Sequence, residues 1–453
     1  MNPPWKPVLE GKLAQEAHIA VEAIADALRV DNLDDRQEAA IRASLASIRE
    51  TPVQPQDLHA PKASLASGTA GIALFWAYLA HATQRDADAE RAAACLDAAI
   101  DTVAHDPMKA SLYGGYTGVA YVVEHLNQRF FGDDGDGEAD VHDQAGEADD
   151  MQETIDQAVY QVLQTASELD EFDLISGSVG QGVYGLERFP HPAALPCLQA
   201  VVGSLQTRAV HPSPGLNAWY TPSVLLPPWQ RELAPHGYYN LGLAHGVPGV
   251  IGLLGHIVAT GAVPEAWPLL EAAVAWLLRQ QLPPSAETTF PTCLIEGREP
   301  GPSRSAWCYG DPGVAIALLA AARGAKNAMW ECQAIDMAKK CARRSPQRSG
   351  VQDAALCHGA AGLGHIFNRF YQATHDLEFA AAARFWLQRA LDMRQPDRGF
   401  GGFGVNVFEQ NGQEYPVDHA GFLMGASGIG LALLAAIDST EPAWDRVLLT
   451  AVP

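Results

Sequence analysis

The chain has 453 residues, of which 48% are hydrophobic and 18% are charged, a composition typical of a globular protein with a large interior. Its formal net charge of −23 comes from 53 acidic and 30 basic residues. This acidic balance argues against binding nucleic acid through a surface that neutralises phosphates.

The sequence of residues 1–60 predicts a helical N-terminal segment, which we expect to pack on the main domain. Candidate helices in this segment cover Ala14–Leu28 and Asp35–Arg49. The main domain is expected to occupy residues 61–453.

Seven copies of the pattern Gly-x-x-Gly, each leading into an apolar run, repeat along the main domain. Their first glycines stand 47 to 69 residues apart, and a period of this size is typical of repeat architectures. These glycines are Gly68, Gly115, Gly177, Gly246, Gly310, Gly359 and Gly425.

The runs after the glycine pairs are apolar nearly all round, as expected of helices buried on both sides. Amphipathic segments such as residues 87–104 and 262–281 lie between them and predict a second, outer helix in each repeat. Glycine lets the backbone turn sharply and lets neighbouring segments approach closely. The repeats therefore predict an all-α fold, an α/α toroid with about fourteen helices in two rings.

Two segments interrupt the repeats. Asp133–Asp150 contains nine acidic residues and no basic one, without the ordered spacing of a calcium loop. We expect a solvated acidic loop at about residues 132–152. The proline-rich segment His211–Gly237 precedes the fourth glycine pattern, and we expect it to form an ordered connection near the mouth of a site.

The length of the apolar stretches and the number and spacing of the cysteines indicate the expected cellular location. No apolar stretch reaches the length of about 20 residues that spans a bilayer, so we do not expect an integral membrane protein. The N-terminus lacks the basic start and apolar core of a secretory signal. The seven cysteines are an odd number without compact spacing, which favours a cytoplasmic protein whose cysteines are buried, metal-bound or catalytic.

The repeat register aligns polar groups of neighbouring repeats. Equivalent positions of a closed repeat lie at equivalent heights around one axis, so aligned residues are expected to meet. Directly before the first glycines stand Ser67, Gly114, Ser176, His245, Tyr309, His358 and Met424, and one position earlier stand Ala66, Tyr113, Ile175, Ala244, Cys308, Cys357 and Leu423.

Cys308, Cys357 and His358 are the predicted metal ligands. Two thiolates and one imidazole suit Zn²⁺, and three protein ligands leave the fourth tetrahedral position open, as in catalytic zinc sites. The alternative is two core cysteines that coincide in register. The other five cysteines lie outside these positions and are expected to be buried or incidental thiols.

Several segments of the chain closely resemble hallmark motifs of lanthionine synthetase C-like proteins. The resemblance covers about residues 65–437 and implies a seven-unit α/α toroid that uses zinc. The segments are DLISGSVG (173–180), NLGLAHGVPG (240–249), AWCYGDPG (306–313), LCHGAAG (356–362) and FLMGASGIGL (422–431).

The resemblance also implies an activity. Bacterial members of this family add the cysteine thiols of a dehydrated precursor peptide to dehydroalanine or dehydrobutyrine, which forms lanthionine or methyllanthionine thioether rings. A dehydratase and an exporter are implied as partners in a complex at the membrane. Zinc suits this reaction because it removes the proton of a thiol whose ordinary pKa is about 8.5, and the thiolate is the nucleophile.

The resemblance gives roles to further residues. Thiol attack leaves an enolate, and His245 is implied as the acid that protonates it. Asp173 is implied as a catalytic carboxylate that pairs with a histidine or assists proton transfer, and Arg304 as the group that steadies the enolate. Tyr309 and Trp307 are expected to line the pocket. Structural alternatives are a core histidine for His245, a helix N-cap for Asp173 and simple packing for Trp307.

Other functions remain open at this point. A family member that binds or adds glutathione or other thiols, or a non-catalytic peptide-binding scaffold, carries the same zinc residues. Protein prenyltransferase β-subunits also activate a thiol in an α/α barrel, but they use an Asp/Cys/His set. An α/α-toroid glycoside hydrolase needs two opposed carboxylates, and only Asp173 is well placed.

Overall fold

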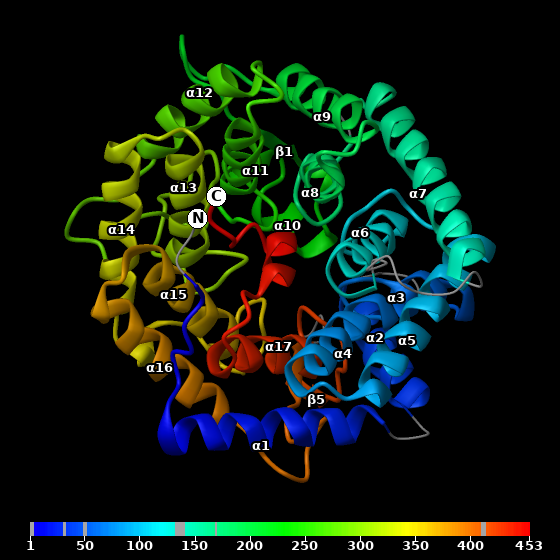
Figure 1. Cartoon of the computed structure of the whole chain (residues 1–453). Helices are drawn as coiled ribbons and strands as arrows, with labels where there is room; N and C mark the ends of the chain where they lie inside the picture. Colours follow the sequence, from blue (N-terminus) through cyan, green and yellow to red (C-terminus); the bar gives the residue numbers. More distant parts are fainter. Residues whose placement is uncertain (1–3, 30–32, 49–51, 132–140, 168–169, 409–413) are drawn as a thin grey trace.

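The helices form a double ring in the computed structural model (Figure 1), and the described residues contain seven inner and seven outer helices. The structure describes residues 4–453 except 30–32, 49–51, 132–140, 168–169 and 409–413. The inner helices are α4 (Thr69–Thr83), α6 (Tyr116–Leu126), α8 (Ser178–Arg188), α11 (Val247–Thr260), α13 (Asp311–Gly324), α15 (Ala360–Thr374) and α17 (Ala426–Ile437). The outer helices are α5 (Asp86–His105), α7 (Val141–Gln164), α9 (Ala194–Arg208), α12 (Ala266–Leu278), α14 (Ala328–Ala342), α16 (Leu377–Asp392) and α1 (Gly11–Leu28). The predicted α/α toroid is confirmed.

Each inner helix begins directly after the first glycine of one Gly-x-x-Gly pattern, which serves as the helix N-cap. The second glycine of each pattern permits a tight approach. A Cβ atom at Gly118 would lie 1.8 Å from the carbonyl oxygen of Leu112, and one at Gly313 would lie 2.1 Å from that of Trp307. Any larger residue would collide with the preceding turn, so the glycines set the entry into the inner helices.

A closed ring of backbone hydrogen bonds joins the turns that precede the inner helices. In each repeat, an N–H group near the second position before the first glycine donates to the equivalent carbonyl oxygen of the next repeat. The seven bonds run from Ala66 to Tyr113 (2.9 Å), Tyr113 to Ile175 (3.2 Å), Leu174 to Ala244 (3.2 Å), Ala244 to Cys308 (3.3 Å), Cys308 to Cys357 (3.2 Å), Cys357 to Leu423 (2.9 Å) and Leu423 to Ala66 (3.1 Å). This ring holds equivalent positions of neighbouring repeats side by side.

The N-terminal segment completes the outer ring. Helix α1 packs against α17 and α16 and takes the outer position of the seventh repeat (Figure 1). The chain before it is tied to the end of α17, because the indole nitrogen of Trp5 donates to the carbonyl oxygen of Ala435 at 2.8 Å. Helices α2 (Leu33–Ile48) and α3 (His59–Ala63) lead from α1 into the first inner helix.

The C-terminal segment fills the centre of the inner ring. Its short 3₁₀ helix, η5 (Ala443–Leu448), lies inside the ring, and the side chain of Val447 is fully buried. The Tyr113 hydroxyl donates to the carbonyl oxygen of Val447, and the indole nitrogen of Trp307 donates to that of Leu448, both at 2.9 Å. Since these donors belong to the second and fifth repeats, the segment joins distant parts of the toroid.

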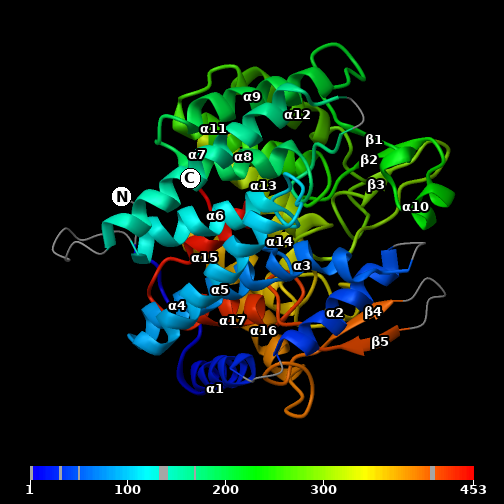
Figure 2. The same ribbon diagram turned by 90° about the vertical axis from the view of Figure 1, so that its right-hand side faces the viewer.

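Short strands gather at one end of the toroid (Figure 2). Strands β1 (Tyr220–Pro222), β2 (Gly237–Asn240) and β3 (Cys293–Leu294) form an antiparallel sheet in that order, and β4 (Val405–Phe408) pairs with β5 (Glu414–Val417). Helix α10 (Pro228–Leu233) lies beside the first sheet. None of the described helices has both the length and the apolar character needed to cross a membrane.

The acidic segment differs from the predicted loop. Residues 132–140 lie outside the described part of the chain, and residues 141–152 form the first turns of α7 rather than a loop. The physical reason is the composition of the second half, because Gln, Ala, Glu and Met between residues 144 and 153 are strong helix formers.

Candidate metal and catalytic centre

Cys308, Cys357 and His358 converge at the turns before α13 and α15. One donor atom from each residue lies within 4.8 Å of the other two. Zinc–ligand distances of about 2.0–2.3 Å separate tetrahedral ligand atoms by about 3.5–3.8 Å, so small side-chain adjustments suffice to bind the ion. In the described part of the chain, no other group of three His, Cys, Asp or Glu residues has this arrangement.

The two thiols differ electrostatically. A hydrogen bond with Cys357 and the nearby charges of Arg304 and His358 hold the pKa of Cys308 well below its usual range, although burial opposes them. The guanidinium Nη2 of Arg304 donates to the Sγ atom of Cys308 at 3.1 Å. The pKa of Cys357 is raised by the hydrogen bond with Cys308 and by burial. Cys308 therefore ionises first, and a bound zinc ion would ionise both thiols.

Asp353 orients the third donor. Its Oδ2 atom lies 3.4 Å from Nε2 of His358, and its Oδ1 atom accepts a hydrogen bond from the backbone of Ala355 at 2.9 Å. With Nε2 at the carboxylate, Nδ1 is the nitrogen left to bind a metal, the usual arrangement of a metal-binding histidine and its outer partner. Burial lowers the pKa of His358, but hydrogen bonds with Asp353 and Cys308 raise it to about 9.

His245 and Asp173, from neighbouring repeats, are in hydrogen-bond contact. The Nδ1 atom of His245 lies 2.5 Å from Oδ2 of Asp173. The other carboxylate oxygen accepts the backbone N–H of Ser176 at 2.7 Å, which fixes the carboxylate before α8. Burial lowers the pKa of His245, but the charge of Asp173 and its hydrogen bond raise it above its ordinary value. With Nδ1 turned to Asp173, Nε2 is the nitrogen that can exchange a proton with a substrate.

Tyr309 connects the metal donors to His245. Its ring stacks on that of His245 with centroids 6.2 Å apart, and the guanidinium carbon of Arg304 lies 6.0 Å from its centroid on one face. The side-chain nitrogen of Asn240 donates to the Tyr309 hydroxyl and to that of Tyr238, both at 3.3 Å. Burial raises the pKa of Tyr309, so its hydroxyl stays protonated and can itself donate a hydrogen bond.

Two of these residues, Asn240 and Asp353, were not predicted from the sequence. The repeat register contains a signal for both, because they stand six positions before a first glycine, in the same place as Arg304. That position supplies a partner for a residue of the centre in three consecutive repeats: Asn240 for Tyr309, Arg304 for Cys308 and Asp353 for His358.

Trp307 does not line the centre. Its side chain is 1% exposed and packs towards the C-terminal segment, where its indole nitrogen is hydrogen-bonded. The expectation that it lines the pocket was therefore wrong, and packing in the ring interior accounts for it. Tyr309, two positions further along the chain, does line the cleft beside His245.

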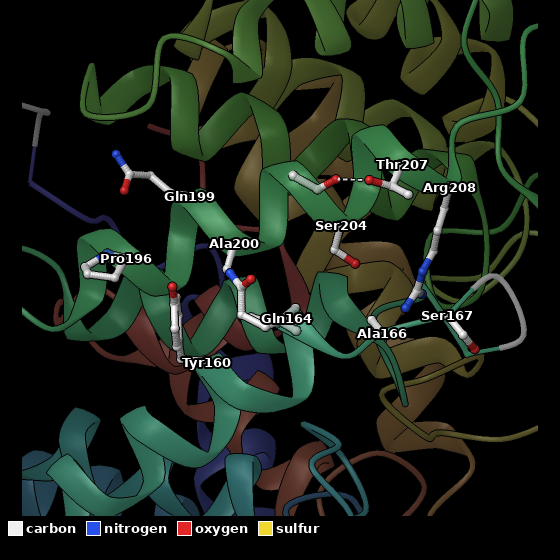
Figure 3. A pocket seen from close by; sticks show the side chains of 12 residues that line it. Tyr160, Gln164, Ala166, Ser167, Pro196, Gln199, Ala200, Ser204, Thr207 and Arg208 are labelled. Atoms are coloured by element: carbon white, nitrogen blue, oxygen red, sulfur yellow. Dashed lines mark hydrogen bonds between the residues drawn. The ribbon is translucent and has the colours of Figure 1, made fainter.

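A cleft of about 620 Å³ opens next to His245. Asp173, His245, Asn240 and Tyr309 line it. Further lining residues come from the proline-rich segment, where η3 (Ser223–Leu225) and α10 follow β1. This segment is ordered and lies beside the centre. A separate groove of about 520 Å³ between α7 and α9 contains none of the predicted site residues (Figure 3).

Comparison with known proteins identifies the family to which this chain belongs. The family model described as lanthionine synthetase C-like protein matches residues 60–449. The chain belongs to the lanthionine synthetase C-like family. The match includes all seven glycine patterns and every residue of the candidate centre.

Two known proteins are similar to this chain. The nisin biosynthesis protein NisC of Lactococcus lactis subsp. lactis is 28% identical over 217 residues, which cover 45% of this chain and 46% of NisC. The matched part thus spans about half the length of this curated relative. The solved structure of a nisin cyclase matches 93% of this chain and 98% of its own, with a TM-score of 0.69 and 19% sequence identity. This likeness concerns the fold.

Proposed function

We propose that this protein is a zinc-dependent lanthipeptide cyclase. It adds cysteine thiols of a dehydrated precursor peptide to dehydroalanine or dehydrobutyrine and closes lanthionine or methyllanthionine rings. The observation that carries the proposal is the position of Tyr309. This residue directly follows Cys308 in the chain, and its ring stacks on that of His245. Tyr309 therefore places the thiol-activating residues next to the proton donor.

Zinc is the cofactor in this proposal, and the donor set fits it. Cys308, Cys357 and Nδ1 of His358 would hold the ion, leaving one tetrahedral position for a substrate. When bound, zinc lowers the pKa of a coordinated thiol so that it reacts as a thiolate. Two anionic protein thiolates keep that sulfur rich in electrons.

The reaction forms one carbon–sulfur bond and loses no atoms. The substrate sulfur attacks the β-carbon of the dehydro residue, and the electrons of the carbon–carbon double bond move onto the adjoining carbonyl as an enolate. Arg304, whose guanidinium lies beside the Cys308 sulfur, supplies positive charge that steadies the enolate, and the Tyr309 hydroxyl is a donor for the enolate oxygen. Nε2 of His245 then gives a proton to the α-carbon, while Asp173 holds the imidazole in position and stabilises its charged form.

Thiol chemistry outside lanthipeptide synthesis is the alternative that shares these residues. A protein that binds or adds glutathione, or a scaffold that only binds thiol peptides, needs the same zinc donors. The paired His245 and Asp173 favour thiol addition over a binding scaffold, because simple thiol binding requires no proton donor. In the cyclase setting, a dehydratase and an exporter are the proposed partners, and the cytoplasm is the proposed location.

The test is ring closure on a dehydrated peptide that contains one cysteine and one dehydroalanine. The purified zinc-loaded protein should remove the free thiol without changing the peptide mass, as followed by thiol alkylation and mass spectrometry. A parallel reaction adds glutathione to a dehydrated peptide that lacks cysteine. Glutathione addition without ring closure favours the broader thiol transferase, and binding without either product favours the scaffold.

A further inference from the structure

Two chemically different groups of side chains line the cleft beside His245. The polar side chains of the centre form one group, and Phe172, Leu226, Pro228 and Trp229 supply apolar surface. Trp229 is 53% exposed. Large apolar side chains that line a concave surface commonly bind a ligand.

The metal donors do not line this cleft. His245 and Tyr309 border it, but Cys308, Cys357 and His358 are absent from its walls. In a ring closure the substrate thiol goes to the metal, and the dehydro residue goes to the proton donor. The cleft therefore receives the half of the peptide that carries the dehydro residue, while the cysteine goes to the metal donors.

The apolar wall is held in shape before any peptide binds. The Nε atom of Arg231 donates to the carbonyl oxygen of Leu226 at 2.6 Å, and α10 begins with Pro228 after a further proline. The Tyr238 hydroxyl on β2 donates to the side-chain oxygen of Gln230 at 3.3 Å, which ties α10 to the sheet. A preformed wall loses little conformational freedom on binding and can discriminate between side chains.

Charge in the cleft strengthens the discrimination. Glu171 and Asp173 border the cleft, and the lining arginine, Arg231, directs its guanidinium to the backbone carbonyl oxygens of Leu226 and Val224. An acidic peptide side chain would meet like charge there, and it would also lose its hydration against Trp229.

Resting on the proposed cyclase function, we propose that this cleft is a subsite for an apolar or aromatic residue adjacent to the dehydro residue, with Trp229 as its main contact. Peptides with Leu next to the dehydro residue are bound and cyclised in preference to peptides with Glu there. The thiol half of the substrate does not depend on this contact.

The experiment compares two peptides that differ only in Leu or Glu beside the dehydroalanine. Wild-type protein should cyclise the Leu peptide with the higher kcat/KM. Trp229→Ala should lower kcat/KM for the Leu peptide about tenfold, mainly through KM, and change the Glu peptide little. Trp229→Phe should restore most of the preference, and zinc content should stay constant. Trp267→Ala removes an exposed tryptophan from outer helix α12 and is the matched control.

A second readout separates this proposal from the cyclase function. Unreactive peptides, with Ala in place of dehydroalanine and Ser in place of cysteine, are titrated calorimetrically with each variant. Tighter binding of the Leu form that is lost in Trp229→Ala supports the subsite even if no ring closes. Ring closure without a Leu preference, or equal effects of Trp229→Ala and Trp267→Ala in both assays, would overturn it.

Discussion

The backbone N–H of Cys308 donates a hydrogen bond to the carbonyl oxygen of Cys357 at 3.2 Å. These cysteines are 49 positions apart in the chain and occupy the same place in consecutive repeats. The bond is one of the seven that close the ring of turns, so the scaffold itself positions the two candidate metal donors. A metal site built in this way would need no dedicated loop.

The first prediction concerns the metal. Purified protein should contain one zinc ion per chain, and Cys308→Ala, Cys357→Ala and His358→Ala should each lose most of it in elemental analysis. Cys332→Ala, at an exposed cysteine on α14, should retain it. The helical circular dichroism signal should persist in all variants because the buried rings do not depend on the ion. Full zinc retention in the three ligand variants would contradict the assignment.

Asp353→Asn should weaken zinc binding without removing a ligand. The carboxylate fixes the His358 ring, and loss of such outer partners costs roughly 10- to 100-fold in metal affinity. Competition with a chromophoric chelator measures the change. Asp336→Asn, at an exposed aspartate of α14, is the matched control. Unchanged affinity in Asp353→Asn would show that His358 is oriented by other contacts.

Asn240 is expected to act through the Tyr309 hydroxyl. Asn240→Ser should lower ring closure roughly 3- to 10-fold in the wild-type background and far less in the Tyr309→Phe background, because contacting residues are energetically coupled. Zinc content should be unchanged in all three variants. Equal losses in both backgrounds would mean that Asn240 supports the turn rather than the hydroxyl.

The pH dependence of cyclisation should reveal the pair of His245 and Asp173. The acid works in its protonated form, and the net effect of its surroundings raises the pKa of His245. The rate should therefore fall as pH rises through that raised pKa. Asp173→Asn removes the charge that raises the pKa, so the alkaline limb of the rate profile should move to lower pH. An alkaline limb at the same pH in both proteins would contradict this origin.

The toroid was predictable because seven glycine patterns mark the start of seven inner helices. The same register predicts that Cys308, Cys357 and His358 lie together, as they do in the structure. The strands were missed because they have two to four residues and are held by pairing between distant segments, which leaves no local periodicity.

Two further site residues and the position of the C-terminal segment could not be predicted from the sequence, because they too depend on contacts between distant segments. Asp353 stands outside the recognised motifs, and Asn240 begins the 240–249 motif without a role implied by it, so only their position relative to the glycines connects them to the centre. The position of the C-terminal segment inside the ring depends on donors such as Tyr113 and Trp307, which come from distant repeats. The local sequence of one segment does not reveal such tertiary contacts.

The most direct test of the account measures zinc content and ring closure together in His245→Ala. Since His245 is proposed as the acid and not as a ligand, the variant should keep its zinc. It should lose about 100- to 10,000-fold in ring closure, the usual contribution of a positioned acid. Loss of zinc would make His245 a ligand or a support of the metal site, and near-normal ring closure with zinc retained would reduce it to a core histidine. Either result would contradict the proposed division between thiol activation and proton donation.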